Sequence, residues 1–211
     1  MLESAQRRGE ASSSGSGSGS ASGSGSGLGL IADRISGCAQ RLADQRGLDG
    51  FTMDDLAGEV GVSRRTLFNH VPGKIDAVLG CGSLAEPEPI ATFRQGGPTG
   101  DLVADIREAG AGVMAINHQD PEEFARLQRV LRSDPRLMNA MLDRFEAIAD
   151  HLTEAIRERE GDAIEPLQAR ILARFSLGLS KISLDEFIAD PSVSAADHYL
   201  RVFDSAVDLF R

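Results

Sequence analysis

Apolar residues recur every three or four positions along most of the chain, the spacing that places them on one face of an α-helix. Leu28, Ile31, Ile35, Cys38 and Leu42 follow this spacing before the sequence reaches a glycine at position 47. No stretch has the strict alternation of a half-buried strand. The pattern predicts an all-α fold, with further helices over about 53–60, 64–70, from 74 onward, 101–117, 121–132, 135–160, 165–188 and 195–211.

Turn-forming residues divide this pattern into three parts. Residues 12–27 contain only Ser and Gly apart from one Ala, so they have nothing to bury and should form a flexible coil. Residues 83–100 hold three prolines and three glycines and are expected to form a connection. We therefore divide the chain into a Ser/Gly-rich disordered tail (1–27), an N-terminal unit (28–82) and a C-terminal unit (83–211).

The charge of the chain is unevenly distributed. Its 211 residues include 22 Lys and Arg against 32 Asp and Glu, a formal net charge of −10. Residues 83–211 hold 23 acidic and 14 basic side chains, whereas residues 28–82 hold seven and six. Such an acidic chain is a poor candidate for coating nucleic acid or anionic membranes non-specifically. With no apolar run of membrane-spanning length, no secretory signal and only two cysteines, the composition indicates a cytoplasmic protein.

Residues 52–71, TMDDLAGEVGVSRRTLFNHV, predict two short helices joined by a tight turn. Thr52 can cap the first helix, with Asp55 as its partner in a capping box. Gly61 follows that helix, where the turn needs a residue that tolerates a positive φ, and Ser63 can cap the second helix. Two short helices joined by a glycine-containing turn form a helix-turn-helix.

The outer face of the second helix carries the candidate chemistry. Its side chains are of the types that read base edges or hold phosphate, because Arg pairs with guanine, Asn with adenine, and Thr or an aromatic ring contacts the thymine methyl. A solvated helix face with two incidental arginines is the alternative, but the position directly after the turn favours DNA. These residues are Arg64, Arg65, Thr66, Phe68, Asn69 and His70.

The stretch from Arg34 to Leu79 resembles the DNA-binding domain of the tetracycline-repressor (TetR) family of transcriptional regulators. The resemblance rests on the amphipathic first helix, the FTMDDLAGEVGVSRRTLFNHV motif and the Pro-Gly-Lys start of the fourth helix. It implies a three-helix helix-turn-helix DNA-binding domain over 28–82, whose third helix enters the major groove of an operator. Phe68 stands where the family usually has Tyr.

The resemblance also implies which side chains contact DNA outside that helix face. Thr52 and Lys74 would hold phosphates on either side of the recognition helix, and Ser63 lies at its start. Val71 and Ile75 depart from the family, which usually has Phe at the first position and an acidic residue at the second; neither change affects the motif itself.

By the same resemblance, the C-terminal helices would form a bundle that encloses a small-molecule cavity and pairs with a second copy. The alternative for each apolar side chain there is an ordinary core position. The expected pocket residues are Met114, Phe124, Met141, Phe145 and Phe175. The expected dimer-interface residues are Phe175, Leu179, Tyr199, Phe203 and Phe210.

Other candidate sites are weaker. Residues 27–32 match the pattern G-x-G-x-x-A, but a dinucleotide-binding turn needs a preceding strand. The four histidines lack metal-ligand spacing. The Asp54-Asp55 and Glu122-Glu123 pairs lie near helix starts, where they complement the helix dipole. We therefore expect no catalytic residues, no cofactor and no metal.

These observations predict a dimeric, ligand-responsive transcriptional regulator, most simply a repressor. Its partners would be a double-stranded DNA operator, an unknown small-molecule effector and a second copy of the chain, with no membrane involved. Two alternatives stay open. One is a DNA-binding architectural protein without an effector, and the other is a helical enzyme or interaction module with an incidental helix-turn-helix.

Overall fold

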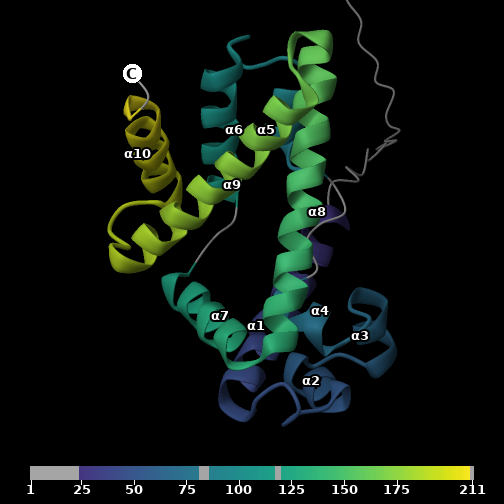
Figure 1. Ribbon diagram of the computed structural model, residues 1–211. Coiled ribbons are helices and arrows are strands. Elements are labelled where there is room, and N and C mark those ends of the chain that lie inside the picture. Colours follow the sequence, from purple (N-terminus) through teal and green to yellow (C-terminus); the bar gives the residue numbers. More distant parts are fainter. Residues whose placement is uncertain (1–23, 81–85, 117–119, 210–211) are drawn as a thin grey trace, which may run out of the picture.

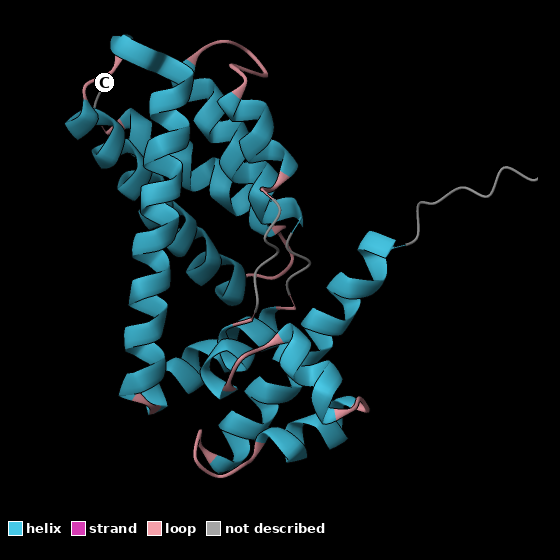
Figure 2. Ribbon diagram, turned by 90° about the vertical axis from the view of Figure 1, so that its right-hand side faces the viewer, coloured by secondary structure: helices cyan, strands magenta, loops and turns pink. Residues whose placement is uncertain are grey.

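The computed structural model describes residues 24–80, 86–116 and 120–209. Helices dominate this part of the chain and no strand occurs in it, so the all-α prediction is confirmed (Figures 1 and 2). The elements in chain order are α1 (Ser24–Arg46), α2 (Met53–Val60), α3 (Arg64–His70), α4 (Lys74–Leu79), α5 (Glu88–Arg94), α6 (Leu102–Ile116), α7 (Pro121–Ser133), α8 (Pro135–Glu160), the short 3-10 helix η1 (Gly161–Ala163), α9 (Pro166–Ala189) and α10 (Ala195–Asp208).

Two boundaries differ from the sequence-based expectation. Helix α1 begins at Ser24, within the stretch expected to be coil, as an extension of the apolar-periodic helix that follows, since adding turns to an existing helix is easier than starting one. Helix α5 forms inside the expected connection, with Pro89 in its first turn, where a missing N–H costs least. Ile90 and Phe93 of α5 are buried, so this short helix is held by packing. Residues 1–23 of the expected tail lie outside the described residues.

The N-terminal core lies among the first four helices and extends beyond them. Leu56, Leu67 and Ile35 are fully buried there, on α2, α3 and α1. Val130 of α7 and Leu137 of α8 are buried in the same core, although both follow residue 82. The N-terminal core therefore includes residues from both sides of the proposed domain boundary at residue 82.

A second core joins α5 and α6 to α8, α9 and α10. Tyr199 of α10 is fully buried at its centre, and burial raises the pKa of its phenol. Gly110 of α6 allows this packing, because a Cβ at that position would lie 2.2 Å from the Tyr199 ring. Figure 1 shows α8 running from the N-terminal helices at one end to α5 and α6 at the other, so one long helix takes part in both cores.

A buried ion pair anchors the loop between α5 and α6. Arg159 Nη2 lies 2.6 Å from Asp105 Oδ2, and both side chains are almost completely buried. The Thr99 amide and hydroxyl each donate to Asp105 Oδ1 at 2.7 Å, and the Gly100 amide donates to Oδ2 at 3.0 Å. Burial alone would raise the pKa of Asp105, but these donors outweigh it and hold that pKa at about 2. The pair is a structural element of the C-terminal half.

Candidate nucleic-acid interface

The turn between α2 and α3 has the predicted geometry. The Asp55 amide donates to Thr52 Oγ1 at 3.1 Å, and the Thr52 amide donates to Asp55 Oδ2 at 2.7 Å, which completes the capping box. These hydrogen bonds from the Thr52 hydroxyl and amide lower the pKa of Asp55. Gly61 has φ of +75°, and its amide donates to the Ala57 carbonyl at 3.0 Å. The predicted cap and turn are confirmed.

Buried contacts below the turn fix how α3 is presented. Leu67 and Val71 at the two ends of its inner face are buried beneath the helix. Ala57 of α2 is also buried, consistent with a close approach of the two helices. From α1, Arg34 Nη2 donates to the Val60 carbonyl at 2.6 Å, which satisfies a carbonyl in the last turn of α2. Helix α3 therefore rests on buried side chains of the N-terminal core.

The outer face of α3 is open to solvent as expected. Arg64, Arg65, Phe68 and Asn69 are exposed there, with Ser63 exposed at the N-cap, whereas Thr66 and His70 are half-buried. The Thr66 amide donates to Ser63 Oγ at 3.0 Å, and the two hydroxyls lie 2.7 Å apart. Six predicted side chains thus share one short helix, and Ser63 orders its first turn.

Arg64 is held in place by neighbours on both sides. Its Nη1 donates to Asp54 Oδ2 of α2 at 2.8 Å, and its guanidinium carbon lies 5.5 Å from the centre of the Phe68 ring. Arg65 makes no hydrogen bond or ion pair among the residues that the structure describes. The two adjacent arginines therefore stand in different surroundings.

The two residues expected to contact flanking phosphates have partners within the chain. Lys74 Nζ donates to the carbonyls of Leu48 at 2.8 Å and Phe51 at 2.9 Å, and lies 5.2 Å from the centre of the Phe51 ring. The Thr52 hydroxyl donates to Asp55 at 2.8 Å. Sequence spacing did not predict the Lys74 contacts, whereas Asp55 is the predicted capping partner of Thr52. Phosphate binding by Lys74 and Thr52 stays a prediction, and each would have to combine it with an internal contact.

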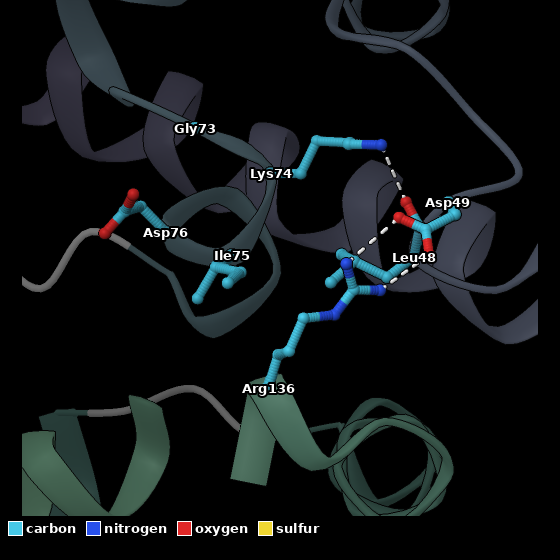
Figure 3. Close-up of a pocket in the computed structure, with 7 residues that line it drawn as sticks. All are labelled: Leu48, Asp49, Gly73, Lys74, Ile75, Asp76 and Arg136. Atoms are coloured by element: carbon cyan, nitrogen blue, oxygen red, sulfur yellow. Dashed lines mark hydrogen bonds and ion pairs between the residues drawn. The ribbon is translucent and has the colours of Figure 1, made fainter. Parts of the chain in front are cut away.

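Beside Lys74, the N-terminal helices meet α8 around a pocket of about 300 Å³ (Figure 3). Arg136 at the start of α8 points across it to Asp49, with Nη2 and Oδ2 2.8 Å apart, and this hydrogen bond lowers the pKa of Asp49. Arg129 of α7 contacts Asp44 of α1 at 2.9 Å in the same way. The lining residues are Leu48, Asp49, Gly73, Lys74, Ile75, Asp76 and Arg136. Two ion pairs thus link the DNA-binding helices to α7 and α8.

The five residues expected to line an effector pocket have different surroundings in the structure. Phe175 lines a mainly apolar pocket of about 560 Å³ between the ends of α6, α9 and α10, and the other four do not. Met114 is buried in the C-terminal core. Phe124 and Met141 are half-buried on α7 and α8, and Phe145 is 41% exposed on α8.

Three of the expected dimer-interface residues are buried within a single chain. Tyr199, Phe203 and Leu179 are 0%, 3% and 5% exposed, because their side chains pack into the chain's own C-terminal core. Their periodic spacing correctly indicated a buried face but did not say which surface covers it. Phe175 is half-buried, and Phe210 lies outside the described residues. The large apolar side chains that α9 leaves exposed are Leu167, Ile171 and Ile182.

The described residues contain no group of three or more His, Cys, Asp or Glu side chains placed to hold a metal ion. Within the same ranges, no helix is both long enough and apolar enough to cross a membrane. Cys38 is buried in the N-terminal core and accepts a hydrogen bond from Arg41 at 3.1 Å.

A short exposed helix rich in base-reading side chains, mounted after a glycine turn in an all-helical chain, defines a helix-turn-helix DNA-binding protein. Residues 38–76 match the family of bacterial regulatory proteins named tetR. The nucleoid occlusion factor SlmA of Vibrio campbellii (strain ATCC BAA-1116) is 29% identical over 164 residues, which cover 73% of this chain and 81% of that protein.

The fold also matches a solved structure. A putative TetR-family transcriptional regulator from Mesorhizobium loti MAFF303099 superposes with a TM-score of 0.51 at 17% identity, covering 87% of this chain and 96% of the other. Residues 38–76 therefore carry a DNA-binding domain of the type found in the tetR family of bacterial regulatory proteins, and the protein is a DNA-binding transcriptional regulator.

Proposed function

We propose that this regulator is a ligand-responsive repressor that binds a palindromic operator as a homodimer in the cytoplasm, without catalytic activity. The observation that carries the proposal is the exposed face of α3, where Arg64, Arg65, Phe68 and Asn69 are presented together. Side chains of these types contact base edges or the flanking phosphates in the major groove. Thr52, Ser63, Thr66, His70 and Lys74 complete the proposed DNA-binding set.

Dimerisation follows from the small size of the DNA-binding unit. One helix-turn-helix covers a single half-site, so tight binding needs two units held about 34 Å apart, one turn of DNA. Exposed Leu167, Ile171 and Ile182 on α9 support a self-complementary apolar interface there. We therefore move the proposed interface to this face of α9 and keep Phe175 beside it.

The effector is proposed to bind on the apolar face of α8 and the neighbouring helices. Met138, Leu142, Phe145 and Ile148 are exposed at helical spacing on α8, which supports an apolar ligand there. Phe124, Met141 and Phe175 are kept as candidate contacts, together with Met114 of the C-terminal core.

A ligand on α8 has a direct route to the DNA-binding helices. Leu137 of α8 and Val130 of α7 are buried in the N-terminal core, and Arg136 and Arg129 hold Asp49 and Asp44. A shift of α7 or α8 would therefore change the position of α3. Such a coupling free energy between two sites is what ligand-controlled repression requires.

The test is a footprint of the purified protein on the DNA upstream of its own gene, with random DNA as competitor. We expect protection of two half-sites about one helical turn apart, and a loss of protection for Arg65→Ala, which removes an exposed side chain without internal contacts. Sequence-independent binding by the parent protein would contradict the proposal.

The similarity to SlmA favours a second candidate function, a DNA-bound nucleoid occlusion factor with no small-molecule effector. Mapping the bound sites across the genome separates the two. One or a few operators beside regulated genes supports the repressor, whereas many dispersed sites with unchanged transcription supports the second candidate.

A further inference from the structure

Asp54 and Phe68 confine the guanidinium of Arg64 on the exposed face of the recognition helix. Arg64 Nη1 lies 2.8 Å from Asp54 Oδ2, and the guanidinium carbon lies 5.5 Å from the centre of the Phe68 ring. The ion pair joins two helices, since Asp54 is on α2 and Arg64 is the first residue of α3. Nε and Nη2 of Arg64 make no further hydrogen bond among the described residues.

Fold stability does not account for this arrangement. The side chains of Arg64 and Asp54 are 65% and 62% exposed, and water screens an ion pair at such a surface. Phe68 is 42% exposed, so its contact with Arg64 also lies at the surface. Arginine side chains normally sample many rotamers, so confining one in solvent has an entropic cost that the fold does not recover. The confinement becomes useful when a ligand meets the guanidinium.

We infer that Asp54 is a positioning residue that holds Arg64, stacked on Phe68, for recognition of a guanine in each half-site. This inference rests on the proposed role of α3 in the major groove. The free nitrogens of Arg64 offer two parallel N–H donors, and guanine presents two acceptors, O6 and N7, at its major-groove edge. Adenine and cytosine each place an amino donor at that edge, so at least one of the two N–H donors of Arg64 would face another donor and remain unpaired.

The carboxylate of Asp54 also makes Arg64 better suited to contact a base than to contact a phosphate of the DNA backbone. A negative charge 2.8 Å from the guanidinium repels phosphate and offsets the positive charge of Arg64. Arg65 has no such carboxylate and is suited to phosphate. The two neighbouring arginines would therefore have different contacts, Arg64 with a base and Arg65 with a backbone phosphate.

The experiment selects binding sites from a random duplex DNA library with the purified full-length protein. The variants are Arg64→Ala, Asp54→Ala and Asp54→Glu, and each is then measured on duplexes that differ at one base pair. Glu59→Ala is the matched control, because Glu59 is also an exposed carboxylate of α2 but makes no hydrogen bond or ion pair within the described residues. The capping box uses Asp55, so Asp54→Ala leaves it intact.

We expect the parent protein to prefer guanine at one position of each half-site by about 5- to 150-fold, the usual range for a bidentate pair. Arg64→Ala should abolish that preference. Asp54→Ala should reduce it by about two- to tenfold, because binding must then immobilise the side chain. Asp54→Glu should restore part of it, and Glu59→Ala should keep the parent's preference.

Two results would overturn the inference while the proposed function stands. In the first, the parent protein selects an operator, and the Asp54→Ala and Glu59→Ala variants discriminate between bases equally well at every position of it. The other is an Arg64→Ala variant that weakens all sequences alike, which would make Arg64 a phosphate contact. A parent protein that selects no sequence would instead refute the proposed function itself. Circular dichroism of each variant verifies that the helices are retained.

Discussion

Lys74 was expected to bind a DNA phosphate, but in the structure its side chain also has hydrogen-bond partners within the protein. Its position after Pro72-Gly73 matched a phosphate contact, yet its ammonium donates to two carbonyls of the loop after α1. Those carbonyls belong to residues 23 and 26 positions earlier, and sequence spacing does not report such pairs. One N–H of the ammonium is left for a phosphate.

Lys74→Met should therefore destabilise the protein as well as weaken DNA binding. It keeps most of the apolar stem but removes a charged donor from two carbonyls, for which we expect a loss of about 1.5–3 kcal/mol in unfolding free energy. Urea unfolding measures this loss. Arg65→Met is the control and should leave the midpoint unchanged; equal midpoints for both variants would show that the Lys74 contacts contribute nothing to stability.

Asp105 should give the protein a distinct response to acid. Its pKa in the folded state is about 2, below the ordinary value of 3.8, so the ionised form is bound more tightly in the folded protein. The resulting stability, on the order of 2 kcal/mol, is complete above pH of about 4 and disappears as the pH falls towards 2.

Asp105→Asn tests this response. Near neutral pH the variant removes the buried counter-charge of Arg159 and leaves it only the partly exposed Glu160, 2.8 Å away, which should cost about 3 kcal/mol. Between pH 5 and 2 the stability of the parent should fall towards that of the variant, as followed by thermal melts in a series of buffers. A constant difference between the two proteins across this range would contradict the assignment.

At the scale of helices, the sequence was sufficient to predict those features that depend only on neighbouring residues. The cap at Thr52, the turn at Gly61 and the proline-led starts of α7, α8 and α9 all depend on residues within four positions of one another. Helix α5 was missed because its prolines and flanking glycines indicate a connection, whereas packing of Ile90 and Phe93 and the ion pairs of Arg94 hold it in place. Apolar periodicity found the buried faces of α9 and α10 but could not identify what covers them.

The crossing of α6 and α10 depends on the absence of one Cβ. Gly110→Ala would place that atom 2.2 Å from the fully buried Tyr199 ring, so the helices must separate, and we expect a loss of about 1–3 kcal/mol or more. Gly58→Ala on α2 meets nothing within 4 Å and should stabilise its helix by up to about 1 kcal/mol.

Pairing the first change with Tyr199→Leu gives a check on the mechanism. If the clash is the cause, the double variant should lose less stability than the sum of the two single variants, because the smaller side chain leaves room for the new methyl group. Additive losses in urea unfolding would place the effect elsewhere.

At the scale of the whole molecule, the proposed dimer depends on which apolar faces remain uncovered in one chain. Ile171→Asp puts a charge on an exposed position of α9, 60% open to solvent, so the folded chain should persist as a monomer. Its operator affinity should fall by about 10²-fold or more, since single half-sites bind weakly. Sedimentation, circular dichroism and a gel shift on a palindromic operator provide the measurements.

Phe203→Asp is the informative contrast to Ile171→Asp. Phe203 is 3% exposed within the chain's own core, so a charge there should unfold the C-terminal half as well as remove DNA binding. A Phe203→Asp protein that is folded but monomeric would indicate that Phe203 belongs to the dimer interface after all. A dimeric Ile171→Asp protein would show that α9 does not supply it.

The burial of Val130 and Leu137 among the first four helices limits how the gene can be recombined. A chimaera that joins residues 28–82 to the C-terminal half of another regulator would set a foreign pair of side chains against Ile35, Leu56 and Leu67. A mismatch in volume there leaves either a void or a clash beneath the recognition helix. Exchange of operator specificity between relatives should therefore succeed when the exchanged piece also brings the side chains at positions 130 and 137. These two positions would then have to change together with the first four helices during evolution.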